Sequence, residues 1–135
     1  MQLRAICKSK IHHATVTEAN LEYIGSIGID SDLMRLANIV SGEKVSIWNV
    51  NNGERIETYA LPLPAHSGGI VINGAAARRF QAHDKVIIVA FTLTDEPVIP
   101  SMILVDQRNR FVNWLGDNRM PEEMEADLAA PAPES

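Results

Sequence analysis

The sequence predicts a mainly β protein, and more specifically a small β-barrel with short helices. Short runs rich in β-branched and aromatic residues recur through residues 1–116 of the 135-residue chain. An Asn-Asn-Gly turn lies between two of these runs, and only two segments carry a helical signal. Many short strands with few helices are typical of a small barrel, and the length suits a single domain.

Seven runs are predicted to form strands, and they cover residues 3–8, 14–17, 44–49, 55–61, 69–72, 85–91 and 102–105. Asn51, Asn52 and Gly53 lie between the third and the fourth of these runs. Asn and Gly accept the positive φ angles that a tight hairpin needs, so we expect a hairpin at this point. Cys7 falls in the first run, where we expect a buried strand residue.

One helix is predicted over residues 32–40. Asp30 or Ser31 can cap its N-terminus, and Gly42 follows as a residue that commonly ends a helix. The apolar face of this helix would consist of Leu33, Leu36, Ala37 and Val40.

Charge is distributed unevenly along the chain. The formal net charge is −5, and residues 117–135 account for all of it with six acids and one arginine. Residues 1–116 carry equal numbers of acidic and basic side chains, so they lack the basic excess typical of nucleic-acid binding. Pro121, Pro131 and Pro133 make the last segment unsuited to a core. We therefore expect one β-barrel domain over residues 1–116 and a mobile acidic tail over residues 117–135.

The sequence favours a soluble cytoplasmic protein without a membrane partner. Its one cysteine, Cys7, can form no disulfide within the chain, as is usual in a reducing compartment. Arg4, Lys8 and Lys10 interrupt any apolar stretch of the kind that a signal peptide needs. The longest apolar run, residues 86–91, is too short to span a membrane.

The dipeptide Gly25-Ser26 follows a short strand-like run and precedes the predicted helix. The Ser26 hydroxyl can attack the Gly25 carbonyl carbon and replace the amide with an ester, if the peptide is held in a strained conformation that glycine tolerates. Elimination across Ser26 would then leave a dehydroalanine, which hydrolyses to an N-terminal pyruvoyl group. Alone, the dipeptide is more often an ordinary turn. A serine hydrolase is a competing interpretation, but the chain lacks a G-x-S-x-G sequence.

The dipeptide belongs to one of four separated motifs in the chain. They read KSKIHHATVT from residue 8, ANLEYIGS from residue 19, IWNVNNGERIETY from residue 47 and VINGAAA from residue 71. In their order and spacing they resemble the aspartate 1-decarboxylase family, and the resemblance covers about residues 1–115. It is specific because four motifs agree, whereas no single one would suffice.

The resemblance implies a fold and an activity. The fold is a double-psi β-barrel, assembled as a homotetramer with active sites between subunits. The activity is the decarboxylation of L-aspartate to β-alanine and CO2, for pantothenate and hence coenzyme A biosynthesis. The chain would be made as a zymogen that cleaves itself into residues 1–25 and residues 26–135. Some members of the family need a helper protein for maturation, and the sequence leaves this open.

The cofactor that the resemblance implies is a covalent pyruvoyl group derived from Ser26, with no PLP and no metal. Loss of CO2 leaves electrons at Cα, and a Schiff base between the substrate amine and the pyruvoyl carbonyl can absorb them, as PLP does in other enzymes. The chain shows no clear lysine site for PLP. His12 and His13 should face opposite ways as neighbours on a strand, and no second cluster offers matching metal ligands.

Thr58 and Tyr59 are the next candidate site residues. A phenol stays protonated at neutral pH, and the resemblance implies that Tyr59 is the proton donor to Cα after decarboxylation. Thr58 should point to the opposite face of its strand, where its hydroxyl can stabilise the oxyanion at the Gly25 carbonyl during self-cleavage. The resemblance also implies that Thr58 contacts substrate. Without the motif, both residues would be ordinary strand residues.

Lys10 and Arg55 are candidates for binding the carboxylates of aspartate. A guanidinium group matches a carboxylate with two hydrogen bonds. A strong ion pair to the departing α-carboxylate would stabilise the ground state and oppose its loss. We therefore assign Arg55 to the retained β-carboxylate, with Lys10 assisting. The alternative for both residues is a solvated surface charge.

Asn73, Gly74, Ala75 and Ala76 form the last candidate group. A second short helix is expected to begin here with Asn73 as its N-cap, so that backbone N–H groups can bind an anion beside small side chains. The resemblance implies substrate binding by Gly74, Ala75 and Ala76 and a part for Asn73 in self-processing. Alone, this tetrapeptide is most often an ordinary helix cap.

Three further residues, His12, Tyr23 and Trp48, are expected to form the wall of the pocket. Two other functions stay open at this point. One is a pyruvoyl decarboxylase for another small acidic amino acid. The other is a non-catalytic β-barrel binding module in which Gly25-Ser26 is only a turn, although such a module would need none of the catalytic side chains.

Overall fold

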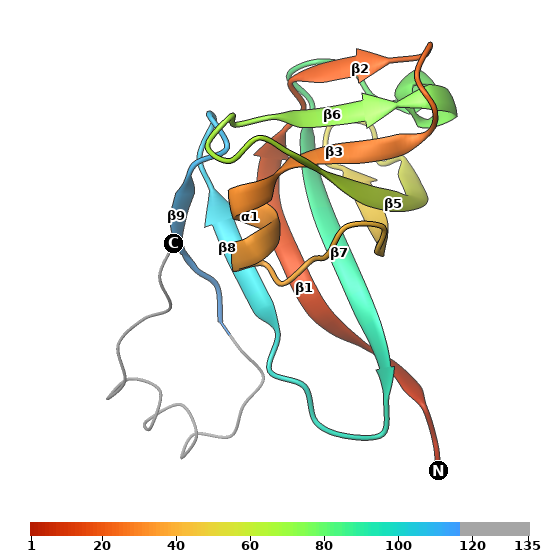
Figure 1. The fold of residues 1–135 in the computed structure, drawn as a ribbon, viewed down its shortest axis with the longest axis vertical. Helices are drawn as coiled ribbons and strands as arrows, with labels where there is room; N and C mark the ends of the chain where they lie inside the picture. Colours follow the sequence, from red (N-terminus) through yellow and green to blue (C-terminus); the bar gives the residue numbers. More distant parts are fainter. Residues whose placement is uncertain (117–135) are drawn as a thin grey trace.

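The computed structural model describes residues 1–116, which form a nine-stranded sheet with two short helices (Figure 1). The elements are β1 (Arg4–Thr15), β2 (Glu18–Asn20), β3 (Ser26–Asp30), α1 (Ser31–Leu36), β4 (Lys44–Asn49), β5 (Arg55–Leu63), β6 (Ile70–Asn73), the 3-10 helix η1 (Gly74–Arg79), β7 (Lys85–Thr94), β8 (Ser101–Val105) and β9 (Phe111–Trp114). The predicted fold class, mainly β and consistent with a small β-barrel, is confirmed. The predicted tail, residues 117–135, lies outside the described residues.

The strands follow the order β2-β6-β3-β5-β4-β7-β1-β8-β9 across the sheet. The long strands β1 and β7 run side by side, while β2, β6, β3 and β5 cross one end of the molecule (Figure 1). Isoleucines fill much of the interior, and the fully buried ones are Ile11, Ile27, Ile29, Ile47, Ile70, Ile72, Ile88 and Ile103. Burying such side chains supplies most of the free energy of folding, so this core holds β3 and β6 in fixed positions.

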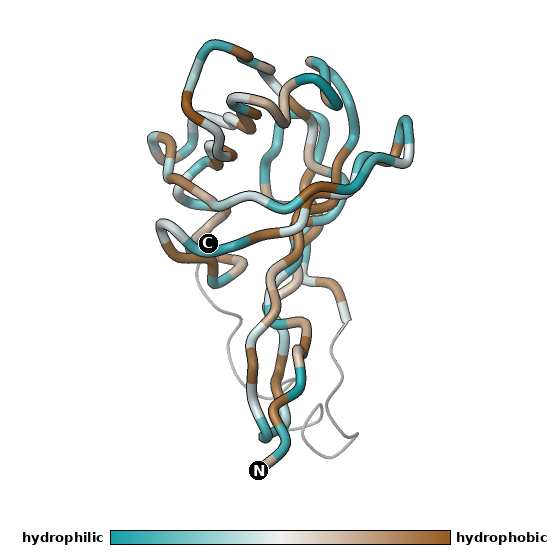
Figure 2. Tube along the Cα trace, turned by 90° about the vertical axis from the view of Figure 1, so that its right-hand side faces the viewer, coloured by the Kyte–Doolittle hydropathy of each residue, from teal (hydrophilic) through white to brown (hydrophobic). Residues whose placement is uncertain are grey.

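The start of β1 and the end of β7 project from this body as a two-stranded arm with the N-terminus at its tip (Figure 2). Arg4 pairs with Thr94 and Cys7 with Phe91, so both strands of the arm are defined by their register. Leu93 is 69% exposed and Phe91 45% exposed. The arm therefore carries large apolar side chains that the described residues of one chain leave uncovered.

Helix α1 begins as predicted and ends earlier than predicted. Asp30 is the N-cap, and its carboxylate accepts a hydrogen bond from the Asp32 N–H at 2.9 Å. Asn38 has a φ of 58°, and the Ile39 N–H donates to the Met34 carbonyl at 2.8 Å. Such a left-handed residue with this hydrogen bond ends a helix, so Asn38 and not Gly42 stops α1. The prediction that Val40 lies on the buried face is therefore wrong, since Val40 is 64% exposed.

Three short strands, β2, β3 and β9, were not expected from the sequence. Because β3 begins at Ser26, the Gly25-Ser26 peptide lies at the start of a strand and not at the end of one. The strands predicted over residues 3–8 and 14–17 are largely one strand, β1, which is interrupted by a bulge between Ile11 and Ala14. Cys7 lies on this strand and is half-buried, not fully buried as expected.

The hairpin predicted at residues 51–53 is confirmed, because it joins the antiparallel strands β4 and β5 and Gly53 has a φ of 78°. No helix within residues 1–116 is both long enough and apolar enough to cross a membrane.

Candidate active site

Ser26 lies beside Asn73 at the point where β3 and β6 begin to pair. The two residues are register partners in the antiparallel pair, and Ser26 is only 2% exposed. The Asn73 side-chain amide donates a hydrogen bond from Nδ2 to the Ser26 Oγ at 3.2 Å. Asn73 occupies the N-cap position of η1, as predicted, and its side-chain amide donates to Ser26 and not to the backbone of the helix. The Asn73 Oδ1 is buried and has no partner within residues 1–116, so it can accept a further hydrogen bond.

Gly74 packs directly against the backbone of Gly25. Its φ is 71°, and a Cβ atom at residue 74 would lie 2.7 Å from the Gly25 Cα and 2.8 Å from the Gly25 nitrogen. Such distances are shorter than real Cβ contacts, so only glycine fits both the space and the backbone conformation. Gly25 is not among the residues with positive φ, so the left-handed backbone belongs to Gly74, which faces Gly25, and not to Gly25 itself.

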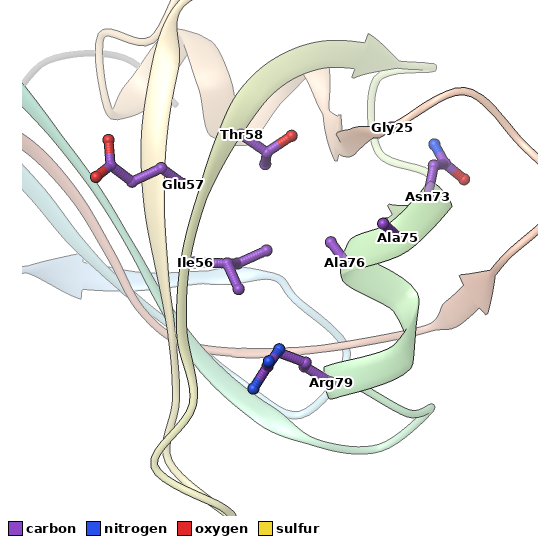
Figure 3. A pocket seen from close by; sticks show the side chains of 8 residues that line it. All are labelled: Gly25, Ile56, Glu57, Thr58, Asn73, Ala75, Ala76 and Arg79. Carbon is purple, nitrogen blue, oxygen red and sulfur yellow. The ribbon is translucent and has the colours of Figure 1, made fainter.

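A pocket of about 330 Å³ opens between β5 and η1, beside Gly25 (Figure 3). It is lined by Gly25, Ile56, Glu57, Thr58, Asn73, Ala75, Ala76 and Arg79. Thr58 and Asn73 approach Gly25 from two elements, while Arg79 lies at the far end of η1 (Figure 3). The structure thus brings together all four residues predicted for self-processing: Gly25, Ser26, Thr58 and Asn73.

The other face of β5 holds a second set of predicted residues. Exposure alternates along this strand, with Arg55 and Tyr59 exposed and Thr58 half-buried. The expectation that Thr58 and Tyr59 point to opposite faces is therefore confirmed. The Arg55 guanidinium carbon lies 4.5 Å from the centroid of the Trp48 ring, a cation–π contact. Trp48 and Arg55 line another cavity, of about 390 Å³, so one chain does not bring Arg55 or Tyr59 into the pocket beside Gly25.

Lys10 and His12 lie on β1, a strand that pairs with β7 and β8 and not with β3 or β6. The rings of His12 and His13 stack with centroids 3.9 Å apart, so the prediction that they face opposite ways is wrong. The reason is the β1 bulge, where His13 has a φ of 63°. Burial lowers the pKa of His12 from 6.5, and the nearby charges of His13 and Lys10 lower it further.

Tyr23 lies in the turn before Gly25 and is 62% exposed. Its carbonyl oxygen would lie 3.0 Å from a Cβ atom at residue 74, but its side chain does not line the pocket. Trp114 packs against Phe111 and the core. Within the described part of the chain, no group of three or more His, Cys, Asp or Glu side chains is arranged to hold a metal ion.

Three pocket residues were missed by the sequence analysis: Ile56, Glu57 and Arg79. Ile56 could have been found, because it lies two residues before Thr58 on the same strand and therefore on the same face. Arg79 carried no such signal. Its place depends on the six-residue length of η1, which the sequence did not fix.

Comparison with known families gives a match over nearly the whole described chain. A family model described as "Aspartate decarboxylase" matches residues 1–112. The match includes all of the residues that line the pocket beside Gly25. It also includes the second set of residues on the outer face of β5.

Curated relatives support the same family. The chain is 50% identical over 113 residues to the aspartate 1-decarboxylase of Heliobacterium modesticaldum, which is 81% of this chain and 86% of the relative. It is 51% identical over 113 residues to the protein of the same name from Acaryochloris marina, with the same coverage. It is 49% identical over 117 residues to the aspartate 1-decarboxylase of Bacillus cereus, which is 84% of this chain and 92% of the relative.

Proposed function

This chain belongs to the aspartate decarboxylase family, and on that premise we propose that it is a carboxy-lyase that converts L-aspartate to β-alanine and CO2. The product would serve pantothenate biosynthesis. The observation that carries the proposal is the meeting of Ser26, Thr58, Asn73 and Gly74 around the Gly25 peptide. We also propose a cytoplasmic location, which the single cysteine favours because it can form no disulfide within the chain.

Maturation would begin with the chain's own serine. The Ser26 Oγ attacks the Gly25 carbonyl carbon, an ester C–O bond forms, the amide C–N bond breaks, and the hydroxyl proton goes to the Ser26 nitrogen. Removal of the Ser26 Cα proton then expels the Gly25 carboxylate and leaves a dehydroalanine. Water hydrolyses it, ammonia leaves, and a pyruvoyl group remains at residue 26. The cleaved chain would consist of residues 1–25 and 26–135.

The surrounding residues suit this cleavage. The Asn73 amide donates to the Ser26 Oγ and fixes its position next to the peptide. Thr58 lines the same pocket as Gly25, so its hydroxyl is suited to stabilise the oxyanion that develops at the Gly25 carbonyl. Gly74 presses against the Gly25 backbone and limits its movement. Each group acts on a different atom of the same peptide.

The pocket also fits a pyruvoyl group. The buried Asn73 Oδ1 has no partner among residues 1–116, and Ala75 and Ala76 line the pocket with small side chains beside Gly25, the residue before Ser26. A pyruvoyl group would supply an electrophilic carbonyl that holds the substrate amine and withdraws electrons when CO2 leaves. Gly74, Ala75 and Ala76 would shape the substrate site, and Thr58 would contact the substrate after its role in maturation.

The outer face of β5 would complete the site from a second copy of the chain. Tyr59 would donate the proton to Cα, Arg55 would bind the β-carboxylate with Lys10 assisting, and His12, Tyr23 and Trp48 would form the wall. We propose a homotetramer, as the resemblance implies, and two observations support an assembly in which copies share sites. One chain leaves Arg55 and Tyr59 outside the pocket beside Gly25, and its β1–β7 arm exposes large apolar side chains.

The test is the intact mass of the purified protein after incubation under warm, native conditions. We expect two fragments split between Gly25 and Ser26, with a pyruvoyl mass on the larger one, and no split in the Ser26→Ala variant. The cleaved protein should then decarboxylate L-aspartate much faster than L-glutamate. If the purified chain is not cleaved, the incubation is repeated with cell extract. Cleavage only in extract would show that a helper protein is needed, whereas a chain that is still not cleaved would contradict the proposed function.

A further inference from the structure

Three adjacent strands carry the side chains proposed for self-cleavage. Ser26 lies at the start of β3, Thr58 on β5 and Asn73 at the end of β6, and β3 runs between the other two strands (Figure 1). Both pairings of β3 are short, because four residue pairs join it to β6 and four join it to β5. The positions of the three side chains relative to one another therefore depend on the register of two short pairings.

Hydrophobic alternation alone defines the register of β3 weakly. All five of its residues are buried, so both faces of the strand are shielded from water. A shift by one residue would exchange the two faces without moving an apolar side chain into solvent. A buried polar contact that identifies one residue can fix the register in such a strand.

Asp30 supplies such a contact at the end of β3 far from Ser26. Its carboxylate is buried, with 1% exposure, and accepts hydrogen bonds from the backbone N–H groups of His66 at 3.0 Å and Gly68 at 2.9 Å. The Asp30 N–H donates in turn to the Gly69 carbonyl at 2.9 Å. These three partners belong to the loop that joins β5 to β6, so one residue fixes the end of β3 against both of its neighbours.

The loop between β5 and β6 is itself anchored to the body of the protein. The buried Asn109 donates from Nδ2 to the carbonyl oxygens of Gly68 and Thr15, each at 2.8 Å. Gly68 has a φ of 68°, and a Cβ atom at residue 68 would lie 2.8 Å from the Arg108 carbonyl oxygen. The backbone is therefore closely packed at this point, and Asp30 is bound to a loop with a fixed position.

We propose that Asp30 is a positioning residue for self-cleavage, which keeps Ser26 in register with Asn73 by fixing the opposite end of β3. The inference rests on the proposed function and extends it to a residue that does not line the pocket. An ionised carboxylate offers only acceptors, and it suits the three backbone N–H groups that donate to it, including that of Asp32 in α1. Asparagine would direct an NH2 group at one of these donors and leave it unpaired in a buried position.

The test compares Asp30→Asn with Asp84→Asn. Asp84 is also buried, and its carboxylate accepts hydrogen bonds from Gln81 and Asn49, which belong neither to β3 nor to the β5–β6 loop. The time course of intact mass measures cleavage of each folded precursor well below its melting temperature, in buffer or extract, whichever cleaves the wild type. We expect cleavage to slow by about 10–100-fold in Asp30→Asn and by less than about twofold in Asp84→Asn.

A second measurement separates positioning from a general loss of stability. Amide hydrogen exchange is compared in the Ser26→Ala background, where the chain stays uncut. We expect Asp30→Asn to speed exchange in residues 26–30 and 70–73 by about threefold or more, while β8 exchanges as in the parent. A general loss of stability would speed exchange in β8 as well.

Several outcomes overturn the inference. They are cleavage of Asp30→Asn at the wild-type rate, equal slowing in both variants, and slower cleavage without faster exchange confined to β3 and β6. If Asp30→Asn does not fold, Asp30→Ser replaces it, because serine keeps an acceptor for the Asp32 N–H at the start of α1, and it should slow cleavage equally. Failure of both variants to fold would show that Asp30 serves the whole fold, which also overturns the inference. A wild-type chain that is not cleaved even in extract would instead contradict the proposed function.

Discussion

The two faces of β5 hold different parts of the proposed chemistry. The inner face presents Thr58 to Gly25 and Asn73, within one chain and beside a buried serine. The outer face presents Arg55 and Tyr59 to the exterior, with Arg55 stacked on Trp48. Residues that are neighbours in sequence are therefore separated by the strand itself, because side chains alternate across a sheet.

This difference predicts that self-cleavage needs one chain, whereas substrate turnover needs two. In the proposed scheme, self-cleavage would use groups that meet on the inner face of one folded chain. Substrate turnover would also use Arg55 and Tyr59 on the outer face, which lie outside the pocket beside Gly25 in the same chain and are proposed to act on residue 26 of another copy. The following variants test this division.

Tyr59→Phe should give the largest effect, and only on turnover. Loss of a general acid lowers rates by about 10²–10⁴-fold, so we expect a fall in kcat of this size while cleavage between Gly25 and Ser26 proceeds as in the wild type. Intact mass and aspartate turnover measure the two properties. Slower cleavage in this variant would show that the outer face takes part in maturation.

The same variant can be rescued if the site is shared. A Ser26→Ala chain keeps Tyr59, and a Tyr59→Phe chain keeps residue 26. Coexpression of the two should restore part of the turnover, because a mixed assembly contains sites with both groups. If the coexpressed variants are no more active than each variant alone, the proposal that the site is shared between copies is wrong.

Thr58→Val should mainly slow self-cleavage, the reaction that we assign to the inner face of β5. Removal of an oxyanion donor costs about 10²–10³-fold, so we expect cleavage to slow by this factor. Thr58→Ser keeps the hydroxyl and is the matched control, with a cleavage rate close to that of the wild type. The time course of intact mass measures both. Equal cleavage rates for Thr58→Val and Thr58→Ser would show that the Thr58 hydroxyl has no role in cleavage.

Gly74→Ala tests whether backbone contact positions the scissile peptide. The new Cβ would lie 2.7 Å from the Gly25 Cα, and a misplacement on the order of 1 Å costs about 100-fold in rate. Gly53→Ala is the matched control, since Gly53 has a φ of 78° and nothing within 4 Å of an added Cβ. Normal cleavage in Gly74→Ala, or equal slowing in both variants, would contradict the role of the contact.

His12 should give the smallest effect, a dependence of stability on pH. Its pKa is lowered from 6.5 in the folded protein, chiefly by burial and then by His13 and Lys10. As the pH falls through 6.5, His12 therefore takes up a proton in the unfolded chain more readily than in the folded protein. Proton uptake by the unfolded chain lowers the free energy of unfolding between 6.5 and the lower pKa of the folded state. Thermal melts of His12→Asn should show a weaker loss on acidification than the wild type. His83→Asn, at an exposed loop position, should keep the wild-type profile.

Much of this fold follows from local sequence signals. The runs of β-branched residues predict β4 and most of β5 and β7, and Asn-Asn-Gly predicts the hairpin. The alternation of side chains on β5 correctly separates Thr58 from Tyr59. The Asp30 cap of α1 also follows from residue type alone.

Other features depend on contacts between distant segments. Strands β2 and β3 are short, and their pairing partner β6 lies about fifty residues away in the sequence. The contact of Gly74 with Gly25 and the hydrogen bonds from Asn49 and Asn52 to the Arg79 carbonyl arise only after these segments meet. The bulge at His13 also escapes a simple alternation rule, because it inserts residues into one strand.

The position of β1 has a consequence for the cleaved molecule. This twelve-residue strand lies between β7 and β8, and it belongs to the segment before Gly25. Cleavage would therefore turn one chain into a two-component complex whose smaller partner is a central strand. Complete unfolding would then also be a dissociation, so the melting temperature of the mature form should rise with protein concentration. The uncut precursor lacks this separation of two chains within the subunit, and dilution would therefore affect it less.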